Sequence, residues 1–233
     1  MKGSATLVIG GSSGIGLATA RLALARGARV TIASRSIDKL ADAARSLGKV
    51  RTEVLDVTDA TAVERFFADR EPWQTVIVAG SATRVGPVRG LPLDEARAAM
   101  DNKFWGAYHV ARHARLVDDG SLTFVSGVYS MRPNATAVLQ GVINSALESL
   151  ARGLALELAP VRVNVVSPST TATPLWDRLG PEGRQAKFEQ MAARLPVGRI
   201  ATADDIAEAI VFVATNRFAT GSTVLVDGGD ALV

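Results

Sequence analysis

Short apolar runs rich in Val, Ile and Thr alternate along the chain with longer segments of helical periodicity. The apolar runs occur at residues 5–10, 29–34, 50–55, 75–80, 121–126, 161–166 and 223–228. Their composition suits strands that are buried on both faces of a sheet. The helical segments lie near residues 15–26, 36–47, 59–70, 92–117, 136–158 and 202–215. Because strands alternate with helices, the pattern predicts right-handed crossovers and a parallel sheet, so the expected fold class is α/β.

Residues 169–200 interrupt this alternation with Thr, Pro and Gly clusters around a charged segment of helical character. In an α/β sheet we expect such a segment to form a mobile flap beyond the strand ends, where ligands bind. No linker, repeat or low-complexity tract divides the chain, so we expect a single domain over residues 1–233, with the substrate flap around 169–200. Thr202 and Asp205 have the spacing of a capping box before the last helix.

Composition and charge restrict the possible partners. The formal net charge is only +3 and the Arg residues are dispersed among Asp and Glu, which favours an ordinary solvated surface over a nucleic-acid surface. The chain has no Cys, so disulfides and thiolate metal sites are excluded. The first residues lack the apolar region of a signal peptide, and no apolar stretch reaches the roughly 18 residues that a membrane helix needs. We therefore expect a soluble, cytoplasmic protein that binds no membrane.

A glycine-rich segment, GGSSGIG at residues 10–16, follows the first predicted strand and precedes a helix. Gly10, Gly14 and Gly16 permit a tight turn and let backbone N–H groups approach a pyrophosphate at the helix N-terminus. Its place between a strand and an amphipathic helix favours a dinucleotide site over an ordinary glycine-rich turn. The Lys of a nucleotide P-loop is absent from this segment.

The second predicted strand ends in Ser34 and Arg35. A fold that prefers NAD usually has an acidic residue here for the ribose 2′-hydroxyl. A guanidinium suits a 2′-phosphate instead, so the sequence favours NADP(H) as the cofactor, with a solvent-facing Arg35 as the alternative. Asp56 and Val57, at the end of the third predicted strand, are expected to meet the adenine.

Motifs in the order of one family continue through the chain: the glycine loop, Asp56-Val57, Ala79-Gly80, Asn102 with Gly106, Arg-Val-Asn at 162–164, Pro168 and the Val-Asp-Gly-Gly that ends at Gly229. The chain resembles the short-chain dehydrogenase/reductase family along essentially its whole length. The resemblance implies a Rossmann-like, doubly wound sheet of about seven parallel strands flanked by helices on both faces. It also implies NAD(P)-linked chemistry on a small-molecule substrate, and a homodimer or homotetramer. The cofactor-binding residues that it implies are Gly10, Ser12, Ser13, Gly14, Ile15, Gly16, Ser34, Arg35, Asp56, Val57, Ala79, Gly80, Asn144, Pro168, Thr171 and Thr173.

The catalytic residues of that family are only partly present. Members have an Asn, a Ser, a Tyr and a Lys; Asn102 matches the Asn, while Gly127, Gln140 and Asn144 stand at the other three positions. Ser126 lies one residue early and is expected on the opposite strand face. In the family the Tyr hydroxyl protonates the carbonyl oxygen, and the Lys holds the nicotinamide ribose and lowers the Tyr pKa. Gln140 releases no proton near neutral pH and Asn144 brings no charge, which removes acid catalysis worth on the order of 10²–10⁴ in rate.

A few other side chains near these positions offer replacement chemistry. Tyr129 lies at the C-terminal end of the fifth predicted strand, where it either supplies a hydroxyl or, as the favoured alternative, forms a wall of the substrate pocket. Arg132 is either a surface residue or an anion clamp. His109 and His113 have i, i+4 spacing but no evident third ligand, so we expect helix-face histidines and no metal site. Residues 227–229 are expected to form a structural turn.

Two classes of function stay open at this point. The favoured hypothesis is an NADP(H)-dependent oxidoreductase, with Asn102, Tyr129, Gln140 and Asn144 as catalytic candidates, that transfers a hydride to an activated small molecule. An iminium carries its own positive charge, and a quinone or enone delocalises the developing charge, so these electrophiles depend less on a protein acid. The alternative is a non-catalytic NADP(H)-binding sensor or regulatory subunit. Restoring Ser, Tyr and Lys together at 127, 140 and 144 is expected to return carbonyl reduction.

Overall fold

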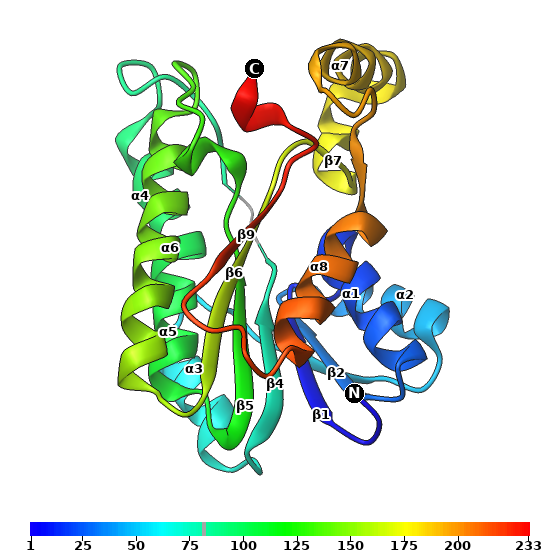
Figure 1. Ribbon diagram of the computed structural model, residues 1–233, viewed down its shortest axis with the longest axis vertical. Helices are drawn as coiled ribbons and strands as arrows, with labels where there is room; N and C mark the ends of the chain where they lie inside the picture. The colour runs from blue at the N-terminus through cyan, green and yellow to red at the C-terminus, as the bar shows by residue number, and fades with distance from the viewer. Residues whose placement is uncertain (81–82) are drawn as a thin grey trace.

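A seven-stranded parallel sheet forms the centre of the molecule (Figure 1). The computed structural model describes residues 1–80 and 83–233. The strand order is β3-β2-β1-β4-β5-β6-β9, which confirms the Rossmann-like prediction. The strands are β1 (Ala5–Ile9), β2 (Arg29–Ser34), β3 (Arg51–Val54), β4 (Trp73–Val78), β5 (Leu116–Val125), β6 (Arg162–Pro168) and β9 (Thr223–Val226). Each of the apolar runs in the sequence therefore overlaps one of these strands.

Helices cover both faces of the sheet (Figure 1), and the side chains of its central strands alternate between two apolar cores. Helices α1 (Gly14–Ala25), α2 (Ile37–Leu47) and α8 (Ala203–Thr215) lie on one face, while α3 (Ala60–Ala68), α4 (Leu93–Met100), α5 (Gly106–His113) and α6 (Val138–Glu157) lie on the other. In β1, for example, Leu7 and Ile9 face the second group of helices and Val8 faces the first. Because both faces are buried, the strands need apolar residues at successive positions.

The segment predicted as one helix over residues 92–117 is divided. A π-helical turn, η1 (Asp101–Trp105), connects α4 to α5, and the helix ends at His113 before β5 begins at Leu116. The prediction was therefore wrong for residues 114–117. A π turn accommodates an extra residue and changes which side chains face the core, and such turns occur frequently at functional sites.

The flap consists of β7 (Thr171–Ala172), the 3-10 helix η3 (Pro174–Leu179), α7 (Gly180–Arg194) and β8 (Ala201–Thr202). Strands β7 and β8 pair in parallel as a small second sheet, which the sequence pattern did not predict. The capping box is confirmed: Asp205 N donates to Thr202 Oγ1 at 3.2 Å, and Thr202 N donates to Asp205 Oδ2 at 2.7 Å. No helix in the described part of the chain is both long and apolar enough to cross a membrane.

Candidate functional site

The glycine loop lies at the C-terminal end of β1, beside the end of β4. An added Cβ at Gly10 would lie 2.3 Å from Gly80 N, and one at Gly16 would lie 2.2 Å from Gly10 O. Gly14 has a φ of +52°, in the left-handed region that glycine adopts without strain. Only glycine therefore fits at these positions. Since β2 and β4 flank β1, the loop also lies where the strand order reverses, which is where ligands bind in such sheets.

The start of α1 is suited to an anion. Ser13 is the N-cap residue, in an extended conformation and without a side-chain capping bond, and the first turn contains no acidic residue. The first backbone N–H groups of a helix need acceptors, and the helix dipole favours negative charge there. Ser12 and Ile15 complete the loop, and the Ile15 side chain packs on the apolar core below it. These residues fit the pyrophosphate of a dinucleotide.

The end of β2 presents a cation. Ser34 is the last residue of this strand, and Ser36 caps α2 by accepting a hydrogen bond from Lys39 N. Arg35 lies between them, is exposed, and makes no hydrogen bond or ion pair with any residue that the structure describes. Its guanidinium is thus available to a phosphate at this edge of the sheet.

The turn after β3 is rigid. Asp56 Oδ1 accepts hydrogen bonds from Thr58 N at 3.0 Å and from Thr58 Oγ1 at 2.8 Å. The Val57 side chain lies against Gly106, where an added Cβ would come within 2.6 Å of it. His109 Nδ1 contacts Val57 O at 2.9 Å, so this histidine supports the turn. Within the described residues, no group of His, Cys, Asp or Glu side chains is arranged to hold a metal.

The remaining predicted cofactor residues lie at the same edge. Ala79 and Gly80 follow β4, and Pro168 ends β6. Thr171 Oγ1 donates to Ser169 O at 2.9 Å, which orders the start of the flap. Thr173 reaches the glycine loop, because an added Cβ at Gly14 would lie 3.3 Å from the Thr173 Cβ. The first residues of the flap therefore lie directly beside the glycine loop.

A buried carboxylate fastens the flap to the C-terminal segment. Asp230 is 1% exposed; its Oδ1 pairs with Arg194 Nη2 of α7 at 2.6 Å, and Ser169 Oγ donates to its Oδ2. Arg132 Nε lies 3.4 Å from Asp230 Oδ1 and donates to Val233 O at 2.7 Å. Arg132 thus anchors the end of the chain, which neither of its two sequence-based interpretations included.

The Asp227 turn is structural, in agreement with the sequence-based expectation. Asp227 Oδ1 accepts from Gly229 N at 3.0 Å and its Oδ2 accepts from Ala231 N at 2.8 Å. The side chain thereby closes the turn that leads into the 3-10 helix η4 (Asp230–Leu232). This turn holds Asp230 in position for the flap.

A lysine that the sequence reasoning missed lies next to the positions that match the catalytic residues of the resembled family. Lys103, in the middle of η1, donates from Nζ to Asn144 Oδ1 at 2.7 Å and to Ser126 O at 2.8 Å. Asn144 is 3% exposed and lies on α6. Its Nδ2 lies against Gly127, where an added Cβ would be 2.9 Å away. The one signal in the sequence was that Lys103 directly follows the matching Asn102.

A second polar group lies one helical turn along α6. Glu148 is buried, and its Oε1 accepts hydrogen bonds from Ser126 Oγ at 2.9 Å and from Ser130 Oγ at 2.6 Å. The expectation that Ser126 and Gly127 face opposite sides was wrong, because both positions face α6. The physical reason is that β5 ends at Val125, so strand alternation no longer applies to them.

Burial lowers the pKa of the Lys103 ammonium to about 8, although the negative charge of Glu148 opposes this effect. The ordinary value for lysine is about 10.4. Burial has this direction because the charged form loses its hydration when it leaves water. The group therefore passes from charged to neutral within the range in which enzymes usually work.

Gln140 and Tyr129 are placed differently from Asn144. Gln140 is 8% exposed and donates from Nε2 to Arg84 O at 2.6 Å, so its amide supports the loop that follows β4. Its Oε1 is buried and has no hydrogen-bond partner among the described residues. Tyr129 lies half-buried in the short helix η2 (Val128–Ser130). Its backbone carbonyl oxygen packs against Gly141 of α6, where an added Cβ would lie only 2.8 Å from it.

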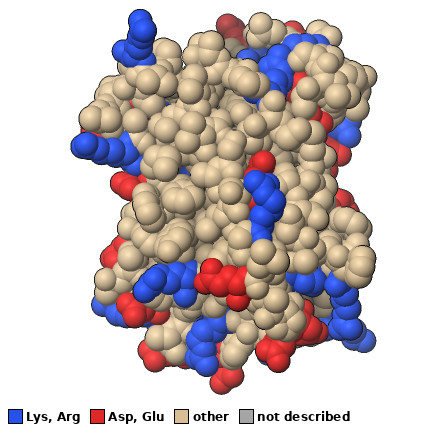
Figure 2. All heavy atoms as spheres, turned by 60° about the vertical axis from the view of Figure 1, so that its left-hand side comes forward, with Lys and Arg blue, Asp and Glu red and all other residues tan. Residues whose placement is uncertain are grey.

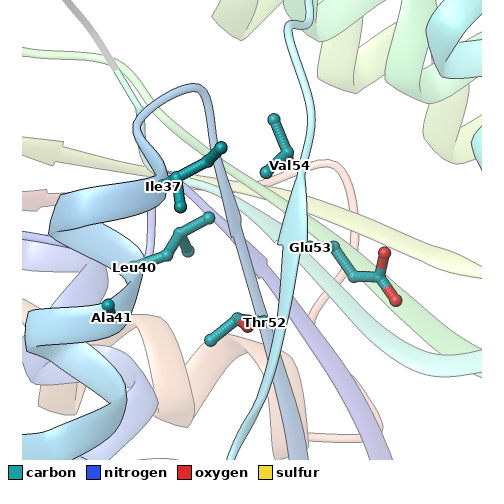
Figure 3. Close-up of a pocket in the computed structure, with 6 residues that line it drawn as sticks. All are labelled: Ile37, Leu40, Ala41, Thr52, Glu53 and Val54. Atoms are coloured by element: carbon teal, nitrogen blue, oxygen red, sulfur yellow. The ribbon is translucent and has the colours of Figure 1, made fainter.

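A separate hollow of about 130 Å³ lies between α2 and the edge strand β3 (Figure 3). Ile37, Leu40 and Ala41 of α2 form one side of it, and Val54 faces it from the strand, whereas the Glu53 carboxylate points away from the helix. None of the residues around Lys103 lines this hollow. It is therefore distinct from the site at the C-terminal edge of the sheet.

Comparison with known proteins agrees with this fold. A family model described as enoyl-(acyl carrier protein) reductase matches residues 9–230. The chain belongs to the short-chain dehydrogenase/reductase family. This is a family of nicotinamide-dependent oxidoreductases. The cis-4-hydroxycyclohexanecarboxylate dehydrogenase of Sinomonas cyclohexanicum is 32% identical, over 96% of this chain and 94% of that protein.

Two solved structures of this family hold NADPH. A small-chain dehydrogenase in complex with NADPH is 34% identical, with a TM-score of 0.85 and full coverage of both chains. A short-chain oxidoreductase from Pseudomonas aeruginosa PAO1, NADPH-bound and described as containing an atypical catalytic center, is 27% identical, with a TM-score of 0.89 over 97% of this chain and 96% of that one. Each of these proteins is similar to this chain in sequence as well as in fold.

The contact between Gly127 and Asn144 generates a prediction about stability. Gly127→Ala forces the Asn144 side chain away from Lys103, because the new Cβ would lie 2.9 Å from Asn144 Nδ2. We expect Gly127→Ala and Asn144→Ala each to lower the free energy of unfolding. The double variant should lose less stability than the sum of the two single losses, by about 0.5–3 kcal/mol, because without the Asn144 side chain the new Cβ has nothing to clash with. Urea denaturation of the four proteins measures this coupling.

Gly153→Ala is the matched control. It lies on the same helix, and an added Cβ there meets nothing within 4 Å. The substitution should stabilise the protein by about 0.5–1 kcal/mol, as expected for alanine in an open helical position. Strictly additive effects at residues 127 and 144 would contradict the contact.

Proposed function

We propose that this protein is an NADP(H)-dependent oxidoreductase that transfers a hydride to an activated small molecule: an iminium, a quinone or an enone. The observation that carries the proposal is the combination of a complete dinucleotide cradle with an amide, Gln140, at the position of the family's tyrosine. The cradle consists of glycines that no larger residue can replace. The Gln140 amide is fixed on Arg84 O and has no proton to release.

Support for NADP(H) over NAD(H) comes from Arg35. The guanidinium is exposed and unpaired among the described residues, and it lies next to the last residue of β2. In such folds this strand end meets the adenosine ribose, so a phosphate on its 2′-oxygen would find a cation there. The NADPH-bound relatives described above support the same preference.

Support for an activated substrate comes from the chemistry of the site. Bound NADPH would supply the hydride. The residues of this chain would orient the substrate and meet the charge that develops on it. The Oδ1 atom of Asn144 accepts a hydrogen bond from Lys103, so the Nδ2 atom is the group that would donate a hydrogen bond to a ribose hydroxyl. The atypical center attributed to one NADPH-bound relative and the conjugated substrate class named by the matching family model point in the same direction.

We also propose that a second copy of this chain covers the face formed by α5 and α6. Figure 2 shows this side of the molecule: uncharged atoms occupy most of its middle, and most charged side chains lie toward its upper and lower ends. Large apolar side chains of α6, Val142 at 54% and Leu156 at 83% exposed, stand out from this helix. Exposed apolar areas of this kind mark interaction surfaces.

The cofactor preference can be measured by titrating NADPH and NADH against the wild type and Arg35→Ala. We expect the wild type to bind NADPH about 10- to 100-fold more tightly, since a charged hydrogen bond to the 2′-phosphate contributes about 1.5–3 kcal/mol. Arg35→Ala should remove most of that difference without changing the affinity for NADH. Arg45→Ala, an exposed arginine at the far end of α2, should leave both affinities unchanged. Equal wild-type affinities would refute the assignment.

The substrate class can be measured by NADPH oxidation with a panel of simple ketones, iminium ions, quinones and enones. We expect turnover of at least one activated class and little or no reduction of simple ketones, because Gln140 stands where the family has the tyrosine that donates the proton. Intact NADPH binding without turnover of any class would instead support a non-catalytic NADP(H)-binding protein.

Lys103 changes the expectation for restoring ketone reduction. The triple variant Gly127→Ser, Gln140→Tyr, Asn144→Lys brings a second ammonium next to Lys103, whose Nζ lies 2.7 Å from Asn144 Oδ1 in the wild type. Like charges at this distance repel each other, so the triple variant should stay inactive on ketones. Adding Lys103→Leu should restore measurable activity.

Self-association can be tested by light scattering of the eluting protein in size-exclusion chromatography, over a wide range of protein concentrations. We expect at least a dimer for the wild type, and a shift toward monomer for Val142→Glu and Leu156→Glu, since a buried unpaired charge is costly. Val54→Glu is the control, because Val54 is equally exposed but lies on the edge strand β3. A wild type that stays monomeric at the highest concentration would exclude this interface.

A further inference from the structure

The Lys103 ammonium is held by neutral groups rather than by an ion pair. Its hydrogen-bond acceptors are the Ser126 carbonyl and the Asn144 amide oxygen, at 2.8 and 2.7 Å. Glu148, the carboxylate that acts on it electrostatically, already accepts hydrogen bonds from two serine hydroxyls. Buried cations whose role is only structural are normally paired with a carboxylate. The arrangement therefore holds a cation in place without neutralising it.

The Lys103 ammonium lies beside two of the three positions at which the chain differs from the family's catalytic residues. Asn144 stands at the position of the family's Lys, Gly127 at that of its Ser, and Lys103 is one hydrogen bond from the first of these. All three lie around the C-terminal end of β5, at the same edge of the sheet as the glycine loop. The cation of the family has thus moved from α6 to the π turn η1.

The ammonium retains one unused donor. A lysine has three N–H groups, and two of them are taken by Ser126 O and Asn144 Oδ1. No residue that the structure describes accepts the third. A ligand with a lone pair at this edge of the sheet is the kind of group that would accept it.

We propose that Lys103 is the proton donor of this site, with the Asn144 amide and the Ser126 carbonyl as the positioning groups that hold its Nζ. This rests on the proposed oxidoreductase function. As the substrate gains a hydride, which bound NADPH would supply, the π electrons of its quinone or conjugated C=C–C=O group shift to oxygen. The proton from Lys103 Nζ joins that oxygen, and the neutral amine then regains a proton from water. For an enone, the enol formed in this way returns to the ketone.

The acidity of Lys103 suits this role. Its pKa of about 8 places the proton-donating form in excess at neutral pH and makes the proton easier to release than that of an ordinary lysine. The groups that face it are Glu148 and Asn144 from α6 and the Ser126 carbonyl from the end of β5, and of these only Glu148 is an ionisable group. Activity should therefore fall as the pH rises through about 8, when the ammonium loses its proton.

The first experiment measures kcat against pH with NADPH and the best quinone or enone from the panel. Lys103→Met should lower kcat by on the order of 10²-fold or more and abolish the alkaline decline. Lys103→Arg should fail to rescue kcat, because a guanidinium keeps its proton. Lys49→Met, at an exposed lysine before β3, is the control and should match the wild type. Tyr129→Phe should retain the alkaline decline; its loss in this variant would assign the proton to Tyr129 instead.

The second experiment needs no turnover. Trace acetylation with acetic anhydride, quantified for each lysine by peptide mass spectrometry across a pH series, reports the pKa of each amine. Lys103 should titrate near 8, and the exposed Lys49 is the comparison amine in the same digest. Asn144→Asp places a carboxylate on the ammonium, so it should raise both the labelling midpoint of Lys103 and the alkaline limit of activity.

The two proposals fail in different ways. A wild type that binds NADPH but reduces no electrophile refutes the oxidoreductase, whatever the labelling shows. An active wild type whose kcat survives Lys103→Met, or whose alkaline limit does not follow Asn144→Asp, refutes Lys103 as the donor. If Lys103→Met does not fold, Lys103→Arg and Asn144→Asp still decide the question, since both keep the charge.

Discussion

The hydrogen bond from Lys103 Nζ to Asn144 Oδ1 joins the π turn η1 to helix α6 at the centre of the candidate site. Asn144 needs the space that a glycine at 127 leaves, because any Cβ there would approach its amide to 2.9 Å. A lysine at 144 would in turn repel the ammonium that now lies beside it. Lys103, Asn144 and Gly127 therefore depend on one another and form one packed group.

The sheet explains how segments distant in the chain meet at this bond. β5 delivers Ser126 and Gly127 to its C-terminal end, and α6 packs beside them. The π turn η1 then directs Lys103 toward α6. In a continuous α-helix over residues 92–117, the Lys103 side chain would have pointed in a different direction around the helix axis. The buried Asp230 in turn pairs with Arg194 of α7. The flap that faces the glycine loop is therefore held by the chain's own C-terminal segment.

The parts of this structure that depend on local pattern were predictable from the sequence. Strands buried on both faces show as apolar runs, and Gly10 and Gly16 lie where any Cβ would clash with the backbone, so both features leave a record in the amino-acid sequence. The contacts of Lys103 could not be predicted in this way, because its partner is 41 residues away and its direction depends on a π turn that periodicity does not reveal. Arg132 was missed for a similar reason, since its partners lie at the end of the chain.

The Lys103 ammonium also distinguishes among the classes of substrate that remain possible without the family's tyrosine. An iminium carries a positive charge, and Lys103 would meet it as a like charge in a site where burial has already lowered the pKa of the amine. A quinone or enone is neutral, and its oxygen gains negative charge as the hydride arrives, so the same ammonium stabilises the transition state more than the bound substrate. Under the proposed function, the charge of Lys103 would therefore favour neutral conjugated carbonyl compounds over iminium ions.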